Sequence, residues 1–208
     1  KLYNALKQTL HIIKSIDKLT LYEQLIDPLN AYYKKKSTRD LKRESAMSLR
    51  LGLTGKDPIT LEATAKKFPK LVTRERVRQL ESKLLKWFGK RNFYIPKLDD
   101  FLDSLQSKNI VTANDCRLLS KEYGSDEYSP QSLKAICELY GKNFNFNIVR
   151  RGGRLTNPQF LITFDPSLFD LIITQGKKFS GNIGFVYSSD LRDFIEYKHG
   201  SELALDLI

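Results

Sequence analysis

The sequence of 208 residues has few of the side chains that build metal centres or disulfide frameworks, with two cysteines and two histidines. Cys116 and Cys137 each lie in an apolar helical stripe, and neither has a second thiol or a histidine at zinc-finger spacing. We therefore expect two buried, reduced thiols and no bound metal. His11 and His199 are far apart on amphipathic segments, and we interpret them as surface or helix-end residues.

Long hydrophobic runs are also missing. The longest, such as Phe160–Ile162 and Leu171–Ile173, span only a few residues, whereas a membrane helix needs about twenty. We expect no membrane association and no signal peptide, and hence a cytoplasmic protein. The chain begins with Lys1 and ends at Ile208 within an amphipathic pattern, so we expect a fragment of a longer protein.

No catalytic constellation is recognisable in the sequence. It has no Gly-x-x-x-x-Gly-Lys phosphate loop, and Arg151-Gly-Gly-Arg154 is too short to replace one. Three acids, Asp99, Asp100 and Asp103, could suggest a metal-dependent nuclease, but acids are also favoured in the first turn of a helix. We adopt the second interpretation, and expect a protein that is not an enzyme and needs no cofactor.

The positive charge, by contrast, is abundant and concentrated in one segment. The chain carries 35 Lys and Arg against 24 Asp and Glu, a formal net charge of +11. Between Lys34 and Arg91 there are 18 Lys and Arg but only 6 Asp and Glu, so the excess of 12 in this segment accounts for the whole net charge. Such a segment is typical of modules that bind nucleic-acid phosphates, and a solvated basic face is the alternative.

Periodicity and capping signals predict a mainly α protein with a small β hairpin. Two helices are expected in a helical segment over residues 1–37. A second module over 38–91 contains a helix capped by Thr60 and a longer helix from Thr73 to about Phe88, separated by a turn. We place a domain boundary within Asn92–Lys97 because of its proline and its polar composition.

The longer helix of this module has two distinct faces. At 100° per residue, four polar side chains fall within an arc of about 140° near its N-terminus; they are Arg74, Glu75, Arg78 and Gln79. The opposite face is apolar, with Val77, Leu80, Leu84, Trp87 and Phe88. Arg can read guanine, Gln adenine and Glu the cytosine amino group, so the polar face suits a helix in the major groove. An ordinary charged surface helix is the alternative.

Three blocks of this module carry a family resemblance. Leu51-Gly-Leu53, Ile59-Thr-Leu-Glu62 and Val72-Thr-Arg-Glu-Arg-Val-Arg-Gln-Leu-Glu-Ser-Lys83 closely resemble the fourth region of bacterial sigma factors, the helix-turn-helix that reads the minus-35 promoter element. The resemblance covers about a quarter of the chain, from Thr38 to Phe88. It implies that Arg74, Glu75, Arg78 and Gln79 contact bases and that Thr60, Leu61 and Thr73 contact phosphates. We add Lys66, Lys67, Arg76 and Lys83 as basic phosphate contacts.

The chain also departs from that family. Pro69-Lys-Leu71 lengthens the turn by two residues where the family has one Gly or Asp. No segment resembles the aromatic helix with which sigma factors melt promoter DNA, and the C-terminal half has no recognisable sigma counterpart. A site shared with a family does not make this chain a promoter-recognition subunit.

Residues 98–165 predict three helices followed by a hairpin, which is the order of a winged helix. The strands are expected at Phe144–Val149 and Gln159–Phe164, with a turn at Gly152–Gly153. Three arginines at the hairpin tip could bind phosphates or the minor groove, unless the turn is merely solvated; they are Arg150, Arg151 and Arg154. Residues 166–208 are expected to be helical apart from a short β-like run at Ile183–Tyr187, and could begin a second winged helix.

Together these features predict sequence-selective binding of double-stranded DNA, with a role in transcription regulation in a bacterial cytoplasm, at the nucleoid. One alternative is the DNA-recognition part of a larger enzyme, such as a restriction or anti-phage effector. Another is a module that docks on RNA polymerase, as the fourth region of sigma factors also does. The sequence leaves the DNA site and the oligomeric state open.

Overall fold

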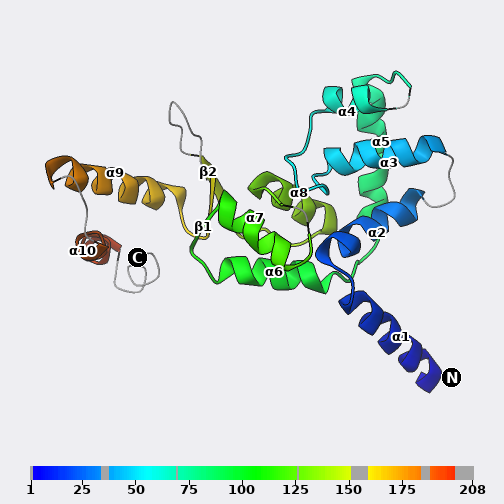
Figure 1. Ribbon diagram of the computed structural model, residues 1–208, viewed down its shortest axis with the longest axis horizontal. Helices are drawn as coiled ribbons and strands as arrows, with labels where there is room; N and C mark the ends of the chain where they lie inside the picture. Colours follow the sequence, from blue (N-terminus) through cyan, green and yellow to red (C-terminus); the bar gives the residue numbers. More distant parts are fainter. Residues whose placement is uncertain are drawn as a thin grey trace. The chain divides into compact units, whose positions relative to one another are not determined.

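The computed structural model describes residues 2–33, 38–68, 70–125, 127–150, 159–183 and 188–199 (Figure 1). These residues are mainly helical with one small antiparallel sheet, which confirms the predicted fold class at that level. The helices are α1 (Leu2–Asp17), α2 (Leu21–Tyr33), α3 (Thr38–Arg50), α4 (Leu61–Lys67), α5 (Arg74–Phe88), α6 (Pro96–Gln106), α7 (Ala113–Glu122), α8 (Pro130–Tyr140), α9 (Pro166–Ile183) and α10 (Ser188–His199). The strands are β1 (Ile110–Thr112), β2 (Asn147–Arg150) and β3 (Gln159–Ile162).

Local capping signals explain where several helices begin and end. Thr60 and Thr73 have extended backbones, and each hydroxyl oxygen accepts a hydrogen bond from the backbone N–H three residues ahead at 3.2 Å. Ser129 caps α8 in the same way at 3.1 Å. At the other end of α8, Gly141 adopts a left-handed φ of 64°, which glycine tolerates because it has no Cβ. The predicted starts of these three helices are confirmed.

The first compact unit comprises Lys1–Leu105 together with Ala113–Phe144. Within it α3, α4 and α5 pack consecutively, α2 packs on α3, and α8 packs on α5. The largest side chains that are fully buried in this unit come from many elements and form its core; they are Leu21, Leu25, Leu29, Met47, Leu53, Leu84, Phe88, Ile95, Leu98, Phe101, Leu105 and Tyr128. A core of this extent anchors α5 by its apolar face.

Helix α8 is fixed against the loop that follows α3. The Ser132 hydroxyl donates to the carbonyl of Gly52, and the Ser129 N–H donates to the carbonyl of Gly55 at 3.0 Å. A Cβ at Gly52 would lie 3.1 Å from the Cα of Ser132, and the φ of Gly52 is +74°. Both the close approach and the left-handed backbone therefore require glycine at this position.

The predicted domain boundary within Asn92–Lys97 does not separate the compact units. Phe93, in that segment, packs at 5.2 Å between ring centroids on Phe88 of α5 and at 5.7 Å on Tyr140 of α8. Gln24 of α2 also accepts a hydrogen bond from the Lys97 N–H at 3.2 Å. Helices α6 to α8 consequently belong to the same unit as α4 and α5, because aromatic and polar contacts cross the predicted linker.

The second compact unit comprises Gln106–Thr112 together with Asn145–Ile208. Its sheet has the order β1-β3-β2, with both pairings antiparallel, and Leu161 of the central strand is fully buried. The ring of Phe160 on β3 packs on Phe169 of α9 at 5.2 Å. The pairing of β2 with β3 confirms the predicted hairpin strands, whereas β1 was not predicted.

Some predicted boundaries in this unit were wrong or fall outside the described residues. The first hairpin strand begins at Asn147 and not at Phe144. The β-like run predicted from Ile183 is not extended at its first residue, since α9 continues through Ile183, and residues 184–187 lie outside the described part. The predicted turn at Gly152–Gly153 lies outside it as well.

Candidate nucleic-acid interface

The polar face of α5 lies open to solvent while its opposite face is buried. All four side chains that we predicted to contact bases are exposed, namely Arg74, Glu75, Arg78 and Gln79. On the other side Val77, Leu84 and Phe88 are buried, and Leu80 and Trp87 are half-buried. The predicted division of the helix into two faces is confirmed. Because the apolar face is packed into the core, the backbone of α5 presents the four polar side chains from a rigid element.

The exposed side chains form a network among themselves. Arg78 donates from Nε to Glu75 Oε2 at 2.8 Å and from Nη2 to Glu75 Oε1 at 2.7 Å. Gln79 donates to the same carboxylate at 3.4 Å and accepts from Arg76 Nη1 at 3.2 Å. The hydrogen bonds from Arg78, above all, lower the pKa of Glu75, so this carboxylate stays ionised and remains a hydrogen-bond acceptor.

The predicted phosphate contacts of α4 lie at its two ends. Thr60 precedes the helix and is exposed, and Leu61 is its first residue and is half-buried. Lys66 and Lys67 are exposed in the last turn. Thr73, which caps α5, is exposed too. The hydroxyls of both capping threonines already accept from backbone N–H groups, so each can offer its O–H to a phosphate oxygen.

Two ion pairs link α5 to the helices before it. Arg74 Nη1 lies 3.1 Å from Glu62 Oε1 on α4, and both side chains are more than half exposed. Arg50 of α3 lies 3.0 Å from Glu81 of α5 through its Nε and donates from Nη1 to the carbonyl of Ile59 at 2.8 Å. The second pair is largely buried and joins α3, the segment before α4, and α5. Sequence reasoning missed Arg50, because its partners are 9 and 31 residues away and no local pattern marks them.

Basic side chains are exposed throughout this module. Arg76 and Lys83, the remaining predicted phosphate contacts of α5, are both exposed. Further exposed cations in the same basic segment are Lys42, Lys56, Lys70, Lys86, Lys90 and Arg91. These side chains are therefore accessible to a polyanion.

Of the three arginines predicted to bind phosphate at the hairpin tip, the structure describes one. Arg150 is exposed at the end of β2, whereas Arg151 and Arg154 lie outside the described residues. Helix α8, the last of the three helices predicted before the hairpin, has two exposed residues, Lys134 and Glu138. Six of its eleven residues are buried, and they are Pro130, Ser132, Leu133, Ile136, Cys137 and Leu139. Its packing against α5 and the loop after α3 leaves little of its surface exposed.

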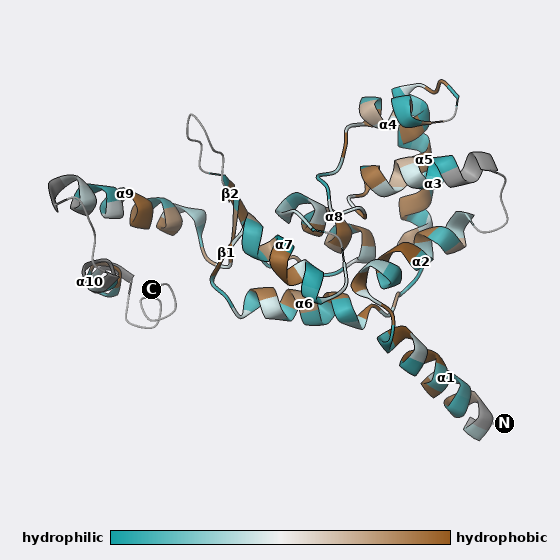
Figure 2. Ribbon diagram, in the orientation of Figure 1, coloured by the Kyte–Doolittle hydropathy of each residue, from teal (hydrophilic) through white to brown (hydrophobic). Residues whose placement is uncertain are grey.

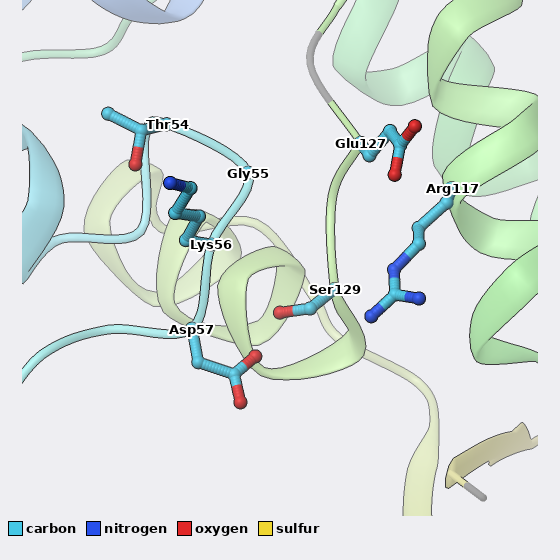
Figure 3. Close-up of a pocket in the computed structure, with 7 residues that line it drawn as sticks. All are labelled: Thr54, Gly55, Lys56, Asp57, Arg117, Glu127 and Ser129. Carbon is cyan, nitrogen blue, oxygen red and sulfur yellow. The ribbon is translucent and has the colours of Figure 1, made fainter.

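A polar pocket of about 520 Å³ lies in the first unit between the loop after α3, helix α7 and the start of α8 (Figure 3). Lys56 and Asp57 line it from the loop, and Arg117 lines it from α7. Glu127 also lines it, but its carboxylate lies 2.6 Å from Lys121. Charges of both signs alternate around the pocket, so its electrostatics favour neither an anion nor a cation.

The cysteines, the acidic residues and the apolar content of the described part of the chain give three further observations. Cys116 and Cys137 are free and fully buried, as predicted, and burial raises the pKa of each thiol to about 12. Among the described residues no cluster of His, Cys, Asp or Glu could hold a metal ion. Asp99 instead pairs with Lys142 at 2.7 Å. None of the described helices has the length and apolar character to cross a membrane.

No family model, no curated protein and no solved structure matches the chain. The resemblance of residues 38–88 to the fourth region of sigma factors therefore stays a prediction.

Proposed function

We propose that the chain binds double-stranded DNA with sequence preference by inserting the N-terminal half of α5 into the major groove, and that it acts in transcription regulation. One observation carries the proposal: the exposed face of α5 bears Arg, Glu and Gln side chains, while the opposite face of the helix is buried. Arg, Glu and Gln are the side chains that read base edges in the major groove. A rigid helix presents them in fixed register.

The spacing along α5 suits a short base sequence. Arg74 and Arg78, like Glu75 and Gln79, are one turn apart, which corresponds to a rise of about 6 Å. Successive base pairs are separated by about 3.4 Å, so one turn of helix spans roughly two base-pair steps. The four side chains together can therefore address about three or four adjacent base pairs.

The internal pair of Arg78 with Glu75 does not prevent base contact. Its two side chains are 61% and 57% exposed, and an exposed ion pair contributes only about 0.2–1 kcal/mol. A bidentate contact between Arg and guanine discriminates by about 1–3 kcal/mol. Arg78 can therefore exchange the carboxylate for a base, and the released Glu75 becomes available to a cytosine amino group.

Phosphate contacts would supply most of the affinity. The capping threonines Thr60 and Thr73 and the exposed lysines Lys66 and Lys67 lie at the ends of α4 and the start of α5. Helix N-termini favour anions as well. These groups carry no sequence information, so they would position α5 and make duplex binding depend on salt.

A winged-helix-like arrangement of residues 98–165 is a further part of the proposal. The element order α6, β1, α7, α8, β2, β3 and the sheet order β1-β3-β2 favour it, whereas the division of these elements between the two compact units, with α6 to α8 in the first and the sheet in the second, does not. Arg150 at the end of β2 would then lie at the base of the wing and contact phosphate or the minor groove. Because α8 is mostly buried, we assign this part to backbone contact and base reading to α5.

The decisive experiment selects bound sequences from a random duplex pool with the unmodified protein, Arg78→Ala and Lys67→Ala. Arg78→Ala should cost about 1–3 kcal/mol on the preferred site and relax selectivity at one position. Lys67→Ala is the matched control from the same module. It should weaken binding to all duplexes alike and leave the base preferences unchanged.

Three outcomes would speak against the proposal in different ways. Identical base preferences for Arg78→Ala and the unmodified protein would show that α5 does not read bases. Absence of any duplex affinity at low salt would reject DNA binding altogether. Binding to RNA polymerase without affinity for duplex would favour the docking module instead.

A further inference from the structure

Leu71, in the connection between α4 and α5, is the most exposed large apolar side chain that the structure describes. Its exposed fraction is 102%, whereas Leu85 and Leu118, two other exposed leucines, are 43% and 52% exposed. Leu71 ends the stretch that lengthens this turn and lies two positions before Thr73, the N-cap of α5. It contributes no burial to the folded chain, so its whole apolar surface is available to a partner.

The charges beside Leu71 are positive and unpaired. Lys66 and Lys67 end α4, Lys70 directly precedes Leu71, and all three are exposed. None of these lysines has an ion-pair partner among the described residues. Figure 2 shows hydrophilic helical turns on both sides of this connection, at the end of α4 and the start of α5. The acidic residues between positions 60 and 83 are each paired with an arginine, and the pairs are Glu62 with Arg74, Glu75 with Arg78 and Glu81 with Arg50.

This setting favours a nucleic acid over a protein as the partner of Leu71. A protein interface has an apolar core that is poor in charged side chains, and it buries roughly 800 Å² on each partner. Leu71 is instead a single apolar side chain that follows three exposed lysines. In the major groove the apolar group on a base edge is the C5-methyl of thymine, which one aliphatic side chain can cover. The neighbouring phosphates would neutralise the lysines.

The distance along the chain brings Leu71 within reach of the groove that α5 would occupy. Leu71 and Arg74 are three positions apart, and such a span is at most about 11 Å, or about three base-pair steps of roughly 3.4 Å. We propose that Leu71 covers the C5-methyl of a thymine at the edge of the site read by α5. This contact rests on the proposed insertion of α5 into the major groove. It makes Leu71 a specificity-determining residue outside the helix itself.

Deoxyuridine removes the thymine methyl and changes nothing else in the duplex. Each thymine of the sequence selected by the unmodified protein is replaced in turn, and the affinities are compared by direct competition. One replacement, within about three base pairs of the base whose preference Arg74→Ala relaxes, should weaken binding about two- to fourfold. That factor corresponds to one methyl group taken out of water. The same replacement should not affect Leu71→Ala, whereas Leu71→Met, which keeps a long apolar side chain, should retain the response.

Leu85→Ala is the matched control, because Leu85 is an exposed leucine in the C-terminal half of α5. It should respond to every deoxyuridine as the unmodified protein does. Leu71 is fully exposed, so its variants should fold. If the unmodified protein selects a sequence but no thymine methyl depends on Leu71, the contact is overturned while base reading by α5 stands. If it selects no sequence, the proposed function is overturned together with the contact. Loss of RNA polymerase binding in Leu71→Ala, with an unchanged response to deoxyuridine, would assign Leu71 to a protein interface instead.

Discussion

Replacing Arg50 by methionine should destabilise the first unit far more than the same change at Arg78. Both arginines form an ion pair with a glutamate in the same module, so the chemistry of the two sites is matched. The difference is burial: the Arg50 and Glu81 side chains are 26% and 16% exposed, against 61% and 57% for Arg78 and Glu75. Arg50 also donates to the carbonyl of Ile59 at 2.8 Å.

The magnitudes follow from these environments. Removing one partner of a buried ion pair costs about 3–5 kcal/mol, and a hydrogen bond to a charged group contributes about 1.5–3 kcal/mol. Because both Arg50 and Glu81 keep some contact with water, we expect Arg50→Met to cost about 2–3 kcal/mol. The exposed pair of Arg78 should contribute about 0.2–1 kcal/mol. The larger loss is a substantial share of a typical stability of about 5–15 kcal/mol, but the unit should still fold.

Urea unfolding followed through Trp87, the only tryptophan of the chain, measures both variants in the first unit. Double-mutant cycles with Glu81→Gln and Glu75→Gln isolate the two pair energies. The coupling energy of Arg50 with Glu81 should exceed that of Arg78 with Glu75 by about 1–2 kcal/mol. Equal coupling energies would refute the reasoning that Arg50 fixes α5 through a buried contact.

Two further predictions concern backbone conformation and buried thiols. Gly52→Ala should lower the free energy of unfolding by about 1–3 kcal/mol more than Gly141→Ala. Both glycines have a left-handed φ, but only at Gly52 does a neighbour lie within 3.1 Å of the added Cβ. Equal losses in urea unfolding would contradict the close packing of α8. The thiols of Cys116 and Cys137, whose pKa is raised to about 12 by burial, should react with a disulfide reagent at pH 8 only as fast as the protein unfolds. Because the folded pKa lies above the unfolded value near 9.0, their contribution to stability should be complete below about pH 9 and be lost as the pH rises toward 12. Rapid labelling of the folded protein would show that the thiols are accessible.

Features that depend on local sequence were predictable. Thr60, Thr73 and Ser129 each cap a helix through a hydrogen bond that reaches only three residues ahead, so their signal lies within one turn. The two faces of α5 follow from a repeat of 3.6 residues, which is visible in the sequence before any tertiary contact forms. The exposure of the four candidate base-reading residues was predictable for the same reason.

Features that depend on contacts between distant residues were decided by the tertiary structure. Strand β1 is only three residues long, and its place in the sheet comes from pairing with β3 about fifty residues later, which no local pattern encodes. The division into units likewise depends on the rings of Phe93 and Tyr140 and on the approach of Ser132 to Gly52. The sequence by itself determined the helices and the polar face of α5, because caps and periodicity are local interactions. Only the tertiary structure decided that α8 is buried against α5 and the loop after α3, and that Arg50 joins α3 to α5, because packing depends on which distant surfaces meet.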